Sequence, residues 1–152
     1  MADAGLIDPP EALWGSVVRT EFPTAVFEFE EAAKCIALDR ATGAVFHLMR
    51  CVEIALKAVA AALQLVAPSN DNWGGWLRVI RAKIDSLPHG TEKDYFQDLY
   101  QRLDAVKDAS RNPCMQVESV YQKDEARHIY ALTEHLFRKL AAKQSETRAR
   151  GQ

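Results

Sequence analysis

The stretch GAVFHLMRCVEIALKAVAAALQLV, residues 43–66, decides the fold class, because its apolar residues recur at the spacing of an α-helix. They follow one another in steps of three and four residues, which places them on a single helical face. This spacing predicts a helix over about Thr42–Leu65. The apolar face consists of Val45, Leu48, Val52, Ala55 (or Leu56), Val59, Ala62 and Val66.

The same rhythm recurs on both sides of this stretch, and nothing in the middle of the chain reads as a strand. The pair Phe22-Pro23 opens an earlier helix, since proline suits a first helical turn. Further helices are predicted over about 73–87, 92–110 and 123–143. We therefore expect an all-α fold, an antiparallel helical bundle of four to five main helices. The remaining inward faces, in chain order, are Phe22, Val26, Phe29, Ala33 and Ile36; Trp76, Leu77, Ile80 and Ile84; Phe96, Leu99, Leu103 and Val106; and Ala126, Ile129, Tyr130, Thr133, Leu136, Phe137 and Leu140.

Length and composition bound the organisation of the chain. Its 152 residues suffice for one domain, and 48% hydrophobic with 26% charged residues is ordinary for a globular protein. We expect residues 1–20 to form a loosely attached N-terminal arm and residues 21–144 to form a single helical domain. The basic residues near the C-terminus predict a flexible basic tail over residues 145–152.

Charge, cysteine content and hydropathy exclude several classes of function. The net charge of −2 gives no field over the whole molecule that favours nucleic acid, so an RNA contact needs a local patch. Cys35, Cys51 and Cys114 are widely spaced, which is typical of a reducing cytoplasm and lacks metal-ligand spacing. The N-terminus carries no export pattern, and the apolar run at 55–66 is too short for a bilayer. We expect a cytoplasmic protein with no metal, no cofactor and no membrane contact.

The main candidate for a functional motif is the hexapeptide RNPCMQ, residues 111–116. Its proline disfavours helical geometry at Asn112, so Arg111 is expected at or near the end of the helix over 92–110. There the guanidinium has two alternative roles. It can hold a phosphate group as a planar fork, or it can cap the last carbonyl groups of the helix.

Four stretches of the chain, in order, resemble the HEPN family of small helical-bundle proteins. They are GAVFHLMRCVE at 43–53, NWG at 72–74, LDAVKDASRNP at 103–113, and Tyr121 followed by DEA at 124–126. In the branch that this chain resembles, the usual motif is Arg-Asn-Pro-x-Met-His, one form of a wider pattern of arginine, four to six residues and histidine. Here Gln116 stands at the histidine position.

The resemblance implies a symmetric homodimer in which two such motifs face each other across one cleft for single-stranded RNA. Active members of the family are ribonucleases that need no metal: histidine polarises the ribose 2′-hydroxyl, which attacks the neighbouring phosphate. By this resemblance Arg111 would hold the phosphate, Asn112 would orient the pair, and Gln116 would occupy the position of histidine. Family members act as toxins of toxin–antitoxin pairs or in antiviral defence, so an antitoxin or another partner protein is expected.

Glutamine at position 116 limits the chemistry that this motif can perform. A carboxamide donates and accepts hydrogen bonds but does not titrate, whereas a general base typically contributes about 10²–10⁴ in rate. We therefore expect RNA cleavage to be weakened or lost through Gln116, unless another group substitutes. The alternative is a non-catalytic dimeric protein-interaction module that uses the same surface.

Candidate cleft-lining residues lie on the helix over 42–65 and just before the last helix. His47, Arg50 and Glu53 form a polar stripe on an otherwise apolar helix, and Tyr121 precedes the last helix. Two interpretations of the stripe stay open. One is a surface ion pair between Arg50 and Glu53, and the other is a cleft lining beside Arg111.

Two tryptophans and two histidines could also bind or cleave RNA, but a structural role is the simpler interpretation of each. Trp73 and Trp76 begin a core-facing helix, where packing is more usual than stacking on bases. His128 and His135 lie seven residues apart in the last helix and could replace the missing histidine. A solvated surface is the simpler interpretation of both.

Overall fold

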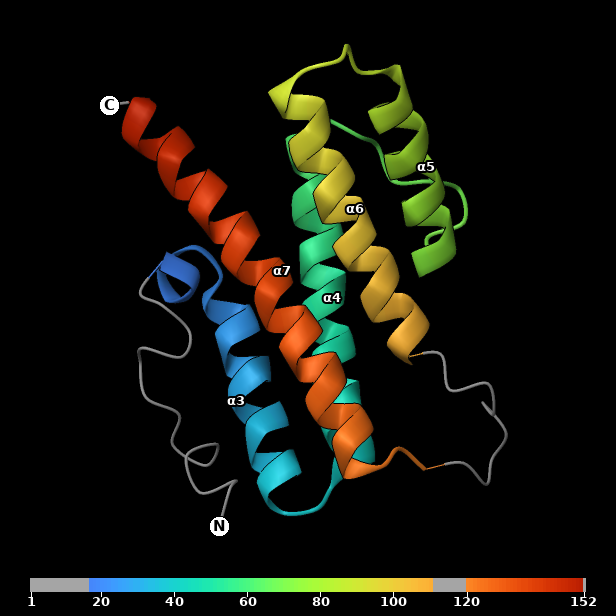
Figure 1. The fold of residues 1–152 in the computed structure, drawn as a ribbon, viewed down its shortest axis with the longest axis vertical. Helices are drawn as coiled ribbons and strands as arrows, with labels where there is room; N and C mark the ends of the chain where they lie inside the picture. The colour runs from blue at the N-terminus through green and yellow to red at the C-terminus, as the bar shows by residue number, and fades with distance from the viewer. Residues whose placement is uncertain (1–16, 111–119, 152) are drawn as a thin grey trace.

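The computed structural model describes residues 17–110 and 120–151, and these are helical almost throughout, with no strand among them. A short helical segment at 17–21 precedes five longer helices (Figure 1). The predicted all-α bundle is therefore confirmed. The five helices are α3 Pro23–Ala37, α4 Ala41–Ala62, α5 Trp73–Ser86, α6 Thr91–Ser110 and α7 Lys123–Arg150.

The helix boundaries follow from local signals in the sequence. Helix α3 has Pro23 in its first turn, and the chain reverses into α4 through Asp39, whose φ of 57° is left-handed. Helix α7 starts after Gln122, whose backbone N–H donates to Oε1 of Glu125 at 3.1 Å. This bond satisfies a backbone donor at the start of the helix.

The start of α5 depends on a glycine at one position. Asn72 caps the helix, because its Oδ1 accepts a hydrogen bond of 2.8 Å from the backbone N–H of Gly75. A Cβ atom on Gly75 would overlap the backbone carbonyl of Asn70, whereas one on Gly74 would find its nearest neighbour 3.6 Å away. Only glycine therefore fits position 75 without moving the backbone.

The helices do not all alternate in direction. Helices α3 and α4, α5 and α6, and α6 and α7 run antiparallel, as predicted (Figure 1). Helices α4 and α5 run the same way: Trp73 shares a groove with Phe46, and Trp76, one turn later, shares a pocket with Lys57. The connection over 63–72 passes behind α5 to the end at which that helix begins (Figure 1), so α4 and α5 are parallel although the other consecutive helices of the bundle are antiparallel.

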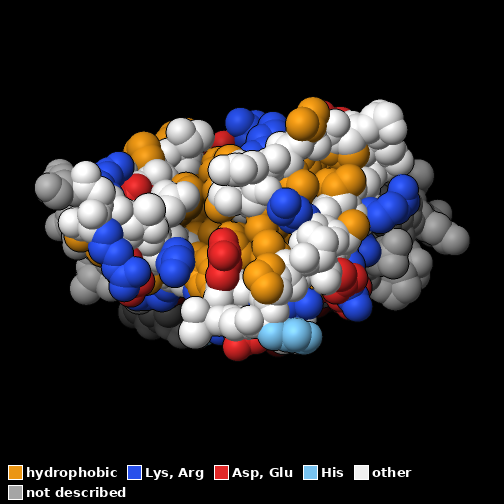
Figure 2. All heavy atoms as spheres, turned by 90° about the horizontal axis from the view of Figure 1, so that it is seen from above, with side chains coloured by type: hydrophobic (Ala, Val, Ile, Leu, Met, Phe, Trp, Pro, Cys, Tyr) orange, Lys and Arg blue, Asp and Glu red, His pale blue; other side chains and the backbone are white. Residues whose placement is uncertain are grey.

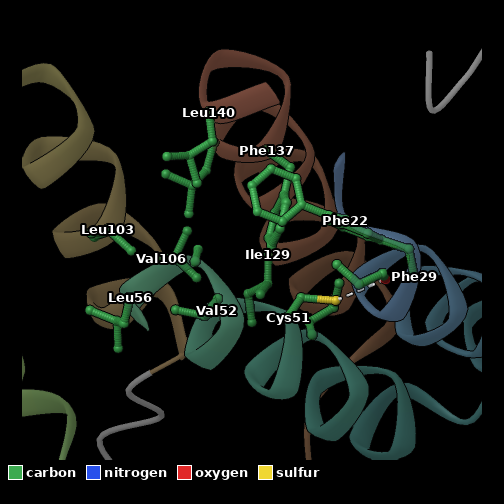
Figure 3. Packing of buried hydrophobic residues seen from close by; sticks show 14 of the residues in the cluster. Phe22, Phe29, Cys51, Val52, Leu56, Leu103, Val106, Ile129, Phe137 and Leu140 are labelled. Atoms are coloured by element: carbon green, nitrogen blue, oxygen red, sulfur yellow. Dashed lines mark hydrogen bonds between the residues drawn. The ribbon is translucent and has the colours of Figure 1, made fainter. Parts of the chain in front are cut away.

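The core is formed by the inward faces that the helical spacing predicts. Phe137 of α7 meets the rings of Phe22 and Phe29 edge to face, with centroids 5.2 and 5.3 Å apart. Figure 3 shows these rings together with Val52 and Ile129 in one cluster. Edge-to-face contacts of this kind add to the free energy gained by burying the rings.

Two predicted boundaries differ from the structure. Helix α4 ends at Ala62, and Gln64 has a φ of 57°, so Ala62 is exposed and Val66 is 85% exposed instead of inward. Helix α7 continues to Arg150, so residues 145–150 of the predicted flexible tail are helical. Arg148 lies 3.1 Å from a carboxylate oxygen of Glu21, a contact that sequence spacing could not reveal.

The N-terminal arm was predicted to extend to residue 20, and its last residues are within the described part. Val18 there is only 3% exposed and belongs to the core cluster. None of the described helices is long and apolar enough to cross a membrane.

Candidate functional site

The hexapeptide at 111–116 lies outside the described residues, and so do its Arg111, Asn112 and Gln116. The structure does describe both ends of the segment that carries it. Ser110 is the last residue of α6, and Tyr121 precedes the start of α7 at Lys123. The motif therefore begins at the residue after Ser110, and its expected position near a helix end stays a prediction, because Arg111 lies outside the described residues.

Tyr121 joins the two ends of this segment to helix α4. Its hydroxyl donates to the backbone carbonyl of Ser110 at 2.5 Å, and its backbone N–H donates to Oγ1 of Thr42 at 3.3 Å. The end of α6, the start of α4 and the approach to α7 are thus held together by one residue. This arrangement brings the chain back to the place from which the motif departs.

A groove of about 630 Å³ lies beside this junction. Helix α4 forms one wall, the first turn of α5 another, and the last turn of α6 with Tyr121 the third. Its surface is mainly apolar, and Lys107 supplies a positive charge. The lining residues are Thr42, Val45, Phe46, Met49, Asn72, Trp73, Gly74, Lys107, Ser110 and Tyr121.

Two aromatic residues of the groove have features that a simple core residue lacks. Phe46 is 70% exposed, although it lies on the helix that forms the centre of the bundle. Trp73 is partly buried, and its indole nitrogen has no hydrogen-bond partner in the part of the chain that the structure describes. Trp76 differs, since its indole N–H donates to Asp71 at 2.5 Å. Trp73 was predicted to be a packing residue, and it both packs and lines the groove.

Phe46 and Lys107 are groove residues that the sequence interpretation missed. The signal was present for Phe46, because an aromatic residue falls outside the apolar spacing that runs through Val45 and Leu48. Lys107 gave no distinct signal, since charged residues are frequent along α6.

The polar stripe on α4 is arranged differently from the predicted ion pair. Nε of Arg50 lies 2.7 Å from Oε1 of Glu28 on α3, and Nδ1 of His47 lies 2.7 Å from Oε2 of the same carboxylate. Glu53 instead lies 3.2 Å from Lys57. The Arg50–Glu53 ion pair, one of the two interpretations left open, is therefore not formed, because packing of α3 against α4 offers Arg50 a buried carboxylate.

Of the four candidate cleft-lining residues, Tyr121 alone belongs to the groove lining. His47, Arg50 and Glu53 are absent from that lining, and lie on neighbouring parts of the α4 surface. Arg50 follows Phe46 by four residues, which places the two side by side on the helix. The structure thus brings His47 and Arg50 together and separates Glu53 from them.

Glu28 is the residue whose role was not predicted. It is 3% exposed, and it falls on the inward face of α3 between Ala25 and Ala32. The predicted inward face of this helix did not include Glu28, although it lies three residues after Ala25 and four before Ala32, which are both buried. A charge at such a position requires partners, and α4 supplies them.

The described cysteines have no feature of a reactive or metal-binding site. Cys51 is buried and its thiol donates to the carbonyl of Ala25 at 3.5 Å (Figure 3). Burial, and then the charge of Glu28, raises the pKa of Cys51. Within residues 17–110 and 120–151, no group of three or more His, Cys, Asp or Glu side chains could hold a metal ion.

A second cavity, of about 660 Å³, lies at the opposite end of the bundle, between the end of α4, the start of α6 and the end of α7. Figure 2 shows apolar side chains in the hollow at this end, with acidic and basic side chains around it. Glu21 and Arg148 pair across the rim, and Glu92 adds another negative charge. These mixed charges make the cavity a weaker candidate for an anionic ligand than the groove beside the motif.

Comparison with models of known protein families, with characterised proteins and with solved structures gave no match. The resemblance to the HEPN family therefore depends on the sequence motifs themselves.

Proposed function

We propose that this chain is a HEPN-like protein, related to metal-independent RNA endonucleases, that binds the phosphate groups of single-stranded RNA at a dimer interface. The proposed cleft contains Arg111, Asn112 and Gln116, and its catalytic activity is weakened or lost through Gln116. The observation that carries this proposal is the groove beside Ser110. It is lined by Ser110, the residue before the motif, and by aromatic and basic side chains of the kind that single-strand binders use.

The groove combines aromatic faces with a positive charge. Phe46, Trp73 and Tyr121 offer rings on which bases can stack, and Lys107 offers a charge for the backbone. Stacking on an aromatic ring contributes about 1–3 kcal/mol per base and tolerates any base. The overall charge of −2 is compatible with this function only because the contact is local.

The motif would add a phosphate ligand to this surface. Arg111 stays charged at any working pH and can hold two phosphate oxygens at once. Gln116 can donate a hydrogen bond to a phosphate oxygen or orient a 2′-hydroxyl, but it cannot take the proton. Binding is therefore expected to be retained while the rate of cleavage falls.

The proposed biological setting is a toxin–antitoxin or antiviral defence system in the cytoplasm, with an antitoxin or another protein as partner.

The alternative function, a non-catalytic dimeric interaction module, is favoured by exposed apolar side chains. Those in question are Phe27 at 58%, Leu38 at 67%, Phe46 at 70% and Val120 at 65% exposure. Single exposed apolar residues are common, but a protein partner would cover them.

Fluorescence anisotropy with a labelled single-stranded RNA tests the RNA proposal. Phe46→Ala and Lys107→Gln should each weaken binding, by about 1–3 kcal/mol for the stacking residue. Phe27→Ala is the matched control, because Phe27 is an equally large exposed ring on α3 and is absent from the groove lining. Equal affinities for all three variants and the native chain would contradict the proposal. Dimerisation without any RNA binding would support the interaction module.

A further inference from the structure

Glu28 is a buried carboxylate whose two oxygens are held by two different side chains of α4. Oε2 accepts from Nδ1 of His47, and Oε1 accepts from Nε of Arg50, both at 2.7 Å. The carboxylate is 3% exposed, while the side chains of His47 and Arg50 are 31% and 70% exposed. The cluster therefore has a buried base and two functional groups that reach the surface.

The contact with Glu28 selects one tautomer of His47. An ionised carboxylate only accepts hydrogen bonds, so Nδ1 of the neutral imidazole must carry the proton. Nε2 then carries the lone pair, and it has no hydrogen-bond partner among the residues that the structure describes. An imidazole held in this way by a carboxylate is oriented to accept a proton at Nε2, and the carboxylate stabilises the imidazolium that results.

Arg50 is held in a similar manner. Glu28 engages its Nε, which leaves the two terminal nitrogens of a largely exposed guanidinium for a ligand. Two parallel donors of this kind match the spacing of two oxygens on a phosphate group. Because His47 and Arg50 bind the two oxygens of one carboxylate, their side chains are neighbours, and a phosphodiester held by Arg50 would lie close to the imidazole.

The cluster borders the groove described above. Arg50 lies one helical turn from Phe46, which lines the groove, so the two side chains are neighbours on the surface of α4. A strand whose bases stack on Phe46 and Trp73 would therefore carry its backbone past Arg50 and His47. The groove and the cluster together supply base contacts, a phosphate ligand and a proton acceptor.

We infer that His47 is a catalytic residue for RNA cleavage, with Arg50 as a phosphate ligand and Glu28 as the positioning residue of both. This inference rests on the proposed function, because it takes single-stranded RNA as the substrate. It assigns to His47 the proton transfer that Gln116 cannot perform.

The reaction is a transesterification within the RNA. Nε2 of His47 takes the proton of a ribose 2′-hydroxyl, and the 2′-oxygen forms a bond to the adjacent phosphorus. The bond from phosphorus to the 5′-oxygen of the next nucleotide breaks, and that oxygen takes a proton from water. The products are a 2′,3′-cyclic phosphate and a 5′-hydroxyl, and the imidazolium returns its proton to the hydroxide formed from water.

The test measures cleavage and binding separately, with the full chain and an end-labelled single-stranded RNA. Binding is measured on the same RNA with 2′-deoxy nucleotides, which cannot be cleaved by this route. His47→Gln keeps an N–H donor for Glu28 but has no titratable nitrogen, so the fold is expected to persist. We expect it to lower the cleavage rate by about 10²-fold or more without changing the affinity for the deoxy analogue. His89→Gln is the matched control, since His89 is an exposed histidine in the turn between α5 and α6.

The positioning role of Glu28 has its own readouts. Glu28→Gln should lower kcat by disturbing the tautomer of His47 and should also raise KM by releasing the phosphate ligand Arg50, whereas His47→Gln should lower kcat alone. In the unmodified protein, nitrogen NMR of neutral His47 should show the proton on Nδ1. A proton on Nε2 would overturn the assignment even if the variants fail to fold.

Three results of the RNA experiments separate the two levels of the proposal. Equal cleavage by His47→Gln and the native chain would overturn the role of His47. A native chain that binds the RNA but leaves it uncut would overturn that role as well, while RNA binding itself would stand. A native chain that binds no single-stranded RNA would overturn both.

Discussion

Nδ1 of His47 on α4 donates a hydrogen bond of 2.7 Å to the buried carboxylate of Glu28 on α3. With Arg50 on the other oxygen, this contact explains how a charged residue occupies the inward face of α3. A carboxylate out of water is costly unless it is paired and hydrogen-bonded. The polar residues in the first half of α4 therefore stabilise the packing of α3 on α4, whatever further chemistry they perform.

The contact between Arg50 and Glu28 should contribute measurably to stability. Arg50→Ala leaves one oxygen of a buried carboxylate without its charged partner, and we expect a loss of about 2 kcal/mol in the free energy of unfolding. Urea denaturation followed by circular dichroism measures this loss. Lys57→Ala is the matched control: it removes an exposed pair with Glu53 and should cost less than about 1 kcal/mol. If both variants lost a similar free energy of unfolding, the Arg50 contact would be worth no more than an exposed ion pair, and water would have to solvate the Glu28 carboxylate.

Tyr121 should stabilise the junction from which the motif departs. Tyr121→Phe removes the hydroxyl that donates to the carbonyl of Ser110, and should cost about 1 kcal/mol. Hydrogen exchange should also become faster in the last turn of α6. Tyr100→Phe serves as the control. Tyr100 lies on α6 and is partly exposed, as Tyr121 is, but its hydroxyl does not bond to the carbonyl of Ser110. An unchanged exchange rate near Ser110 would contradict the proposed anchoring role.

The two glycines at the start of α5 should respond differently to alanine. Gly75→Ala places a Cβ atom against the carbonyl of Asn70, and we expect a loss of about 1–3 kcal/mol as the capping turn shifts. Gly74→Ala has open space and should be neutral or stabilising, since alanine favours the helix. Thermal unfolding of the two variants measures the difference. Equal melting temperatures would rule out the close approach at position 75.

Alkaline pH should destabilise the protein in part through Cys51. Burial raises the pKa of its thiol above the ordinary value of 9.0, so the folded chain keeps a proton that the unfolded chain releases. The unfolded state then binds fewer protons, and stability falls as pH rises above about 9, by at most about 1.4 kcal/mol per pH unit for one group. Urea denaturation over this range should show a smaller slope for Cys51→Ala than for the native chain. Equal slopes would exclude a contribution from Cys51.

Helical spacing predicted the fold and most of the core, but it could not predict contacts between helices. Phe29 and Phe137 fall on inward faces by spacing, and both are buried. Val66 was placed on such a face too, yet α4 ends before it, because the left-handed conformation at Gln64 redirects the chain. Spacing suggested a local partner for Arg50, Glu53, whereas the actual partner Glu28 depends on how α3 packs against α4.

The same limit applies to the candidate site. Tyr121 was predicted as a possible cleft-lining residue; it lines the groove and bonds to Ser110 and Thr42, but a cleft formed with the motif stays a prediction. The groove needs three helices at once, so no single stretch of sequence indicates it. The roles of Arg111, Asn112 and Gln116 stay predictions, since these residues lie outside the described part of the chain.

The decisive measurement is the cleavage of single-stranded RNA by three proteins: the native chain, Gln116→His, and Gln116→His combined with Arg111→Ala. If the motif is a ribonuclease site that lacks its own proton carrier, Gln116→His should increase the cleavage rate by about 10²–10⁴ without added metal when all three proteins also carry His47→Gln, so that His47 cannot supply the proton transfer. The Arg111→Ala change should then remove that gain. No increase in Gln116→His, with the helical circular dichroism unchanged, would contradict the proposed relation to RNA-cleaving enzymes.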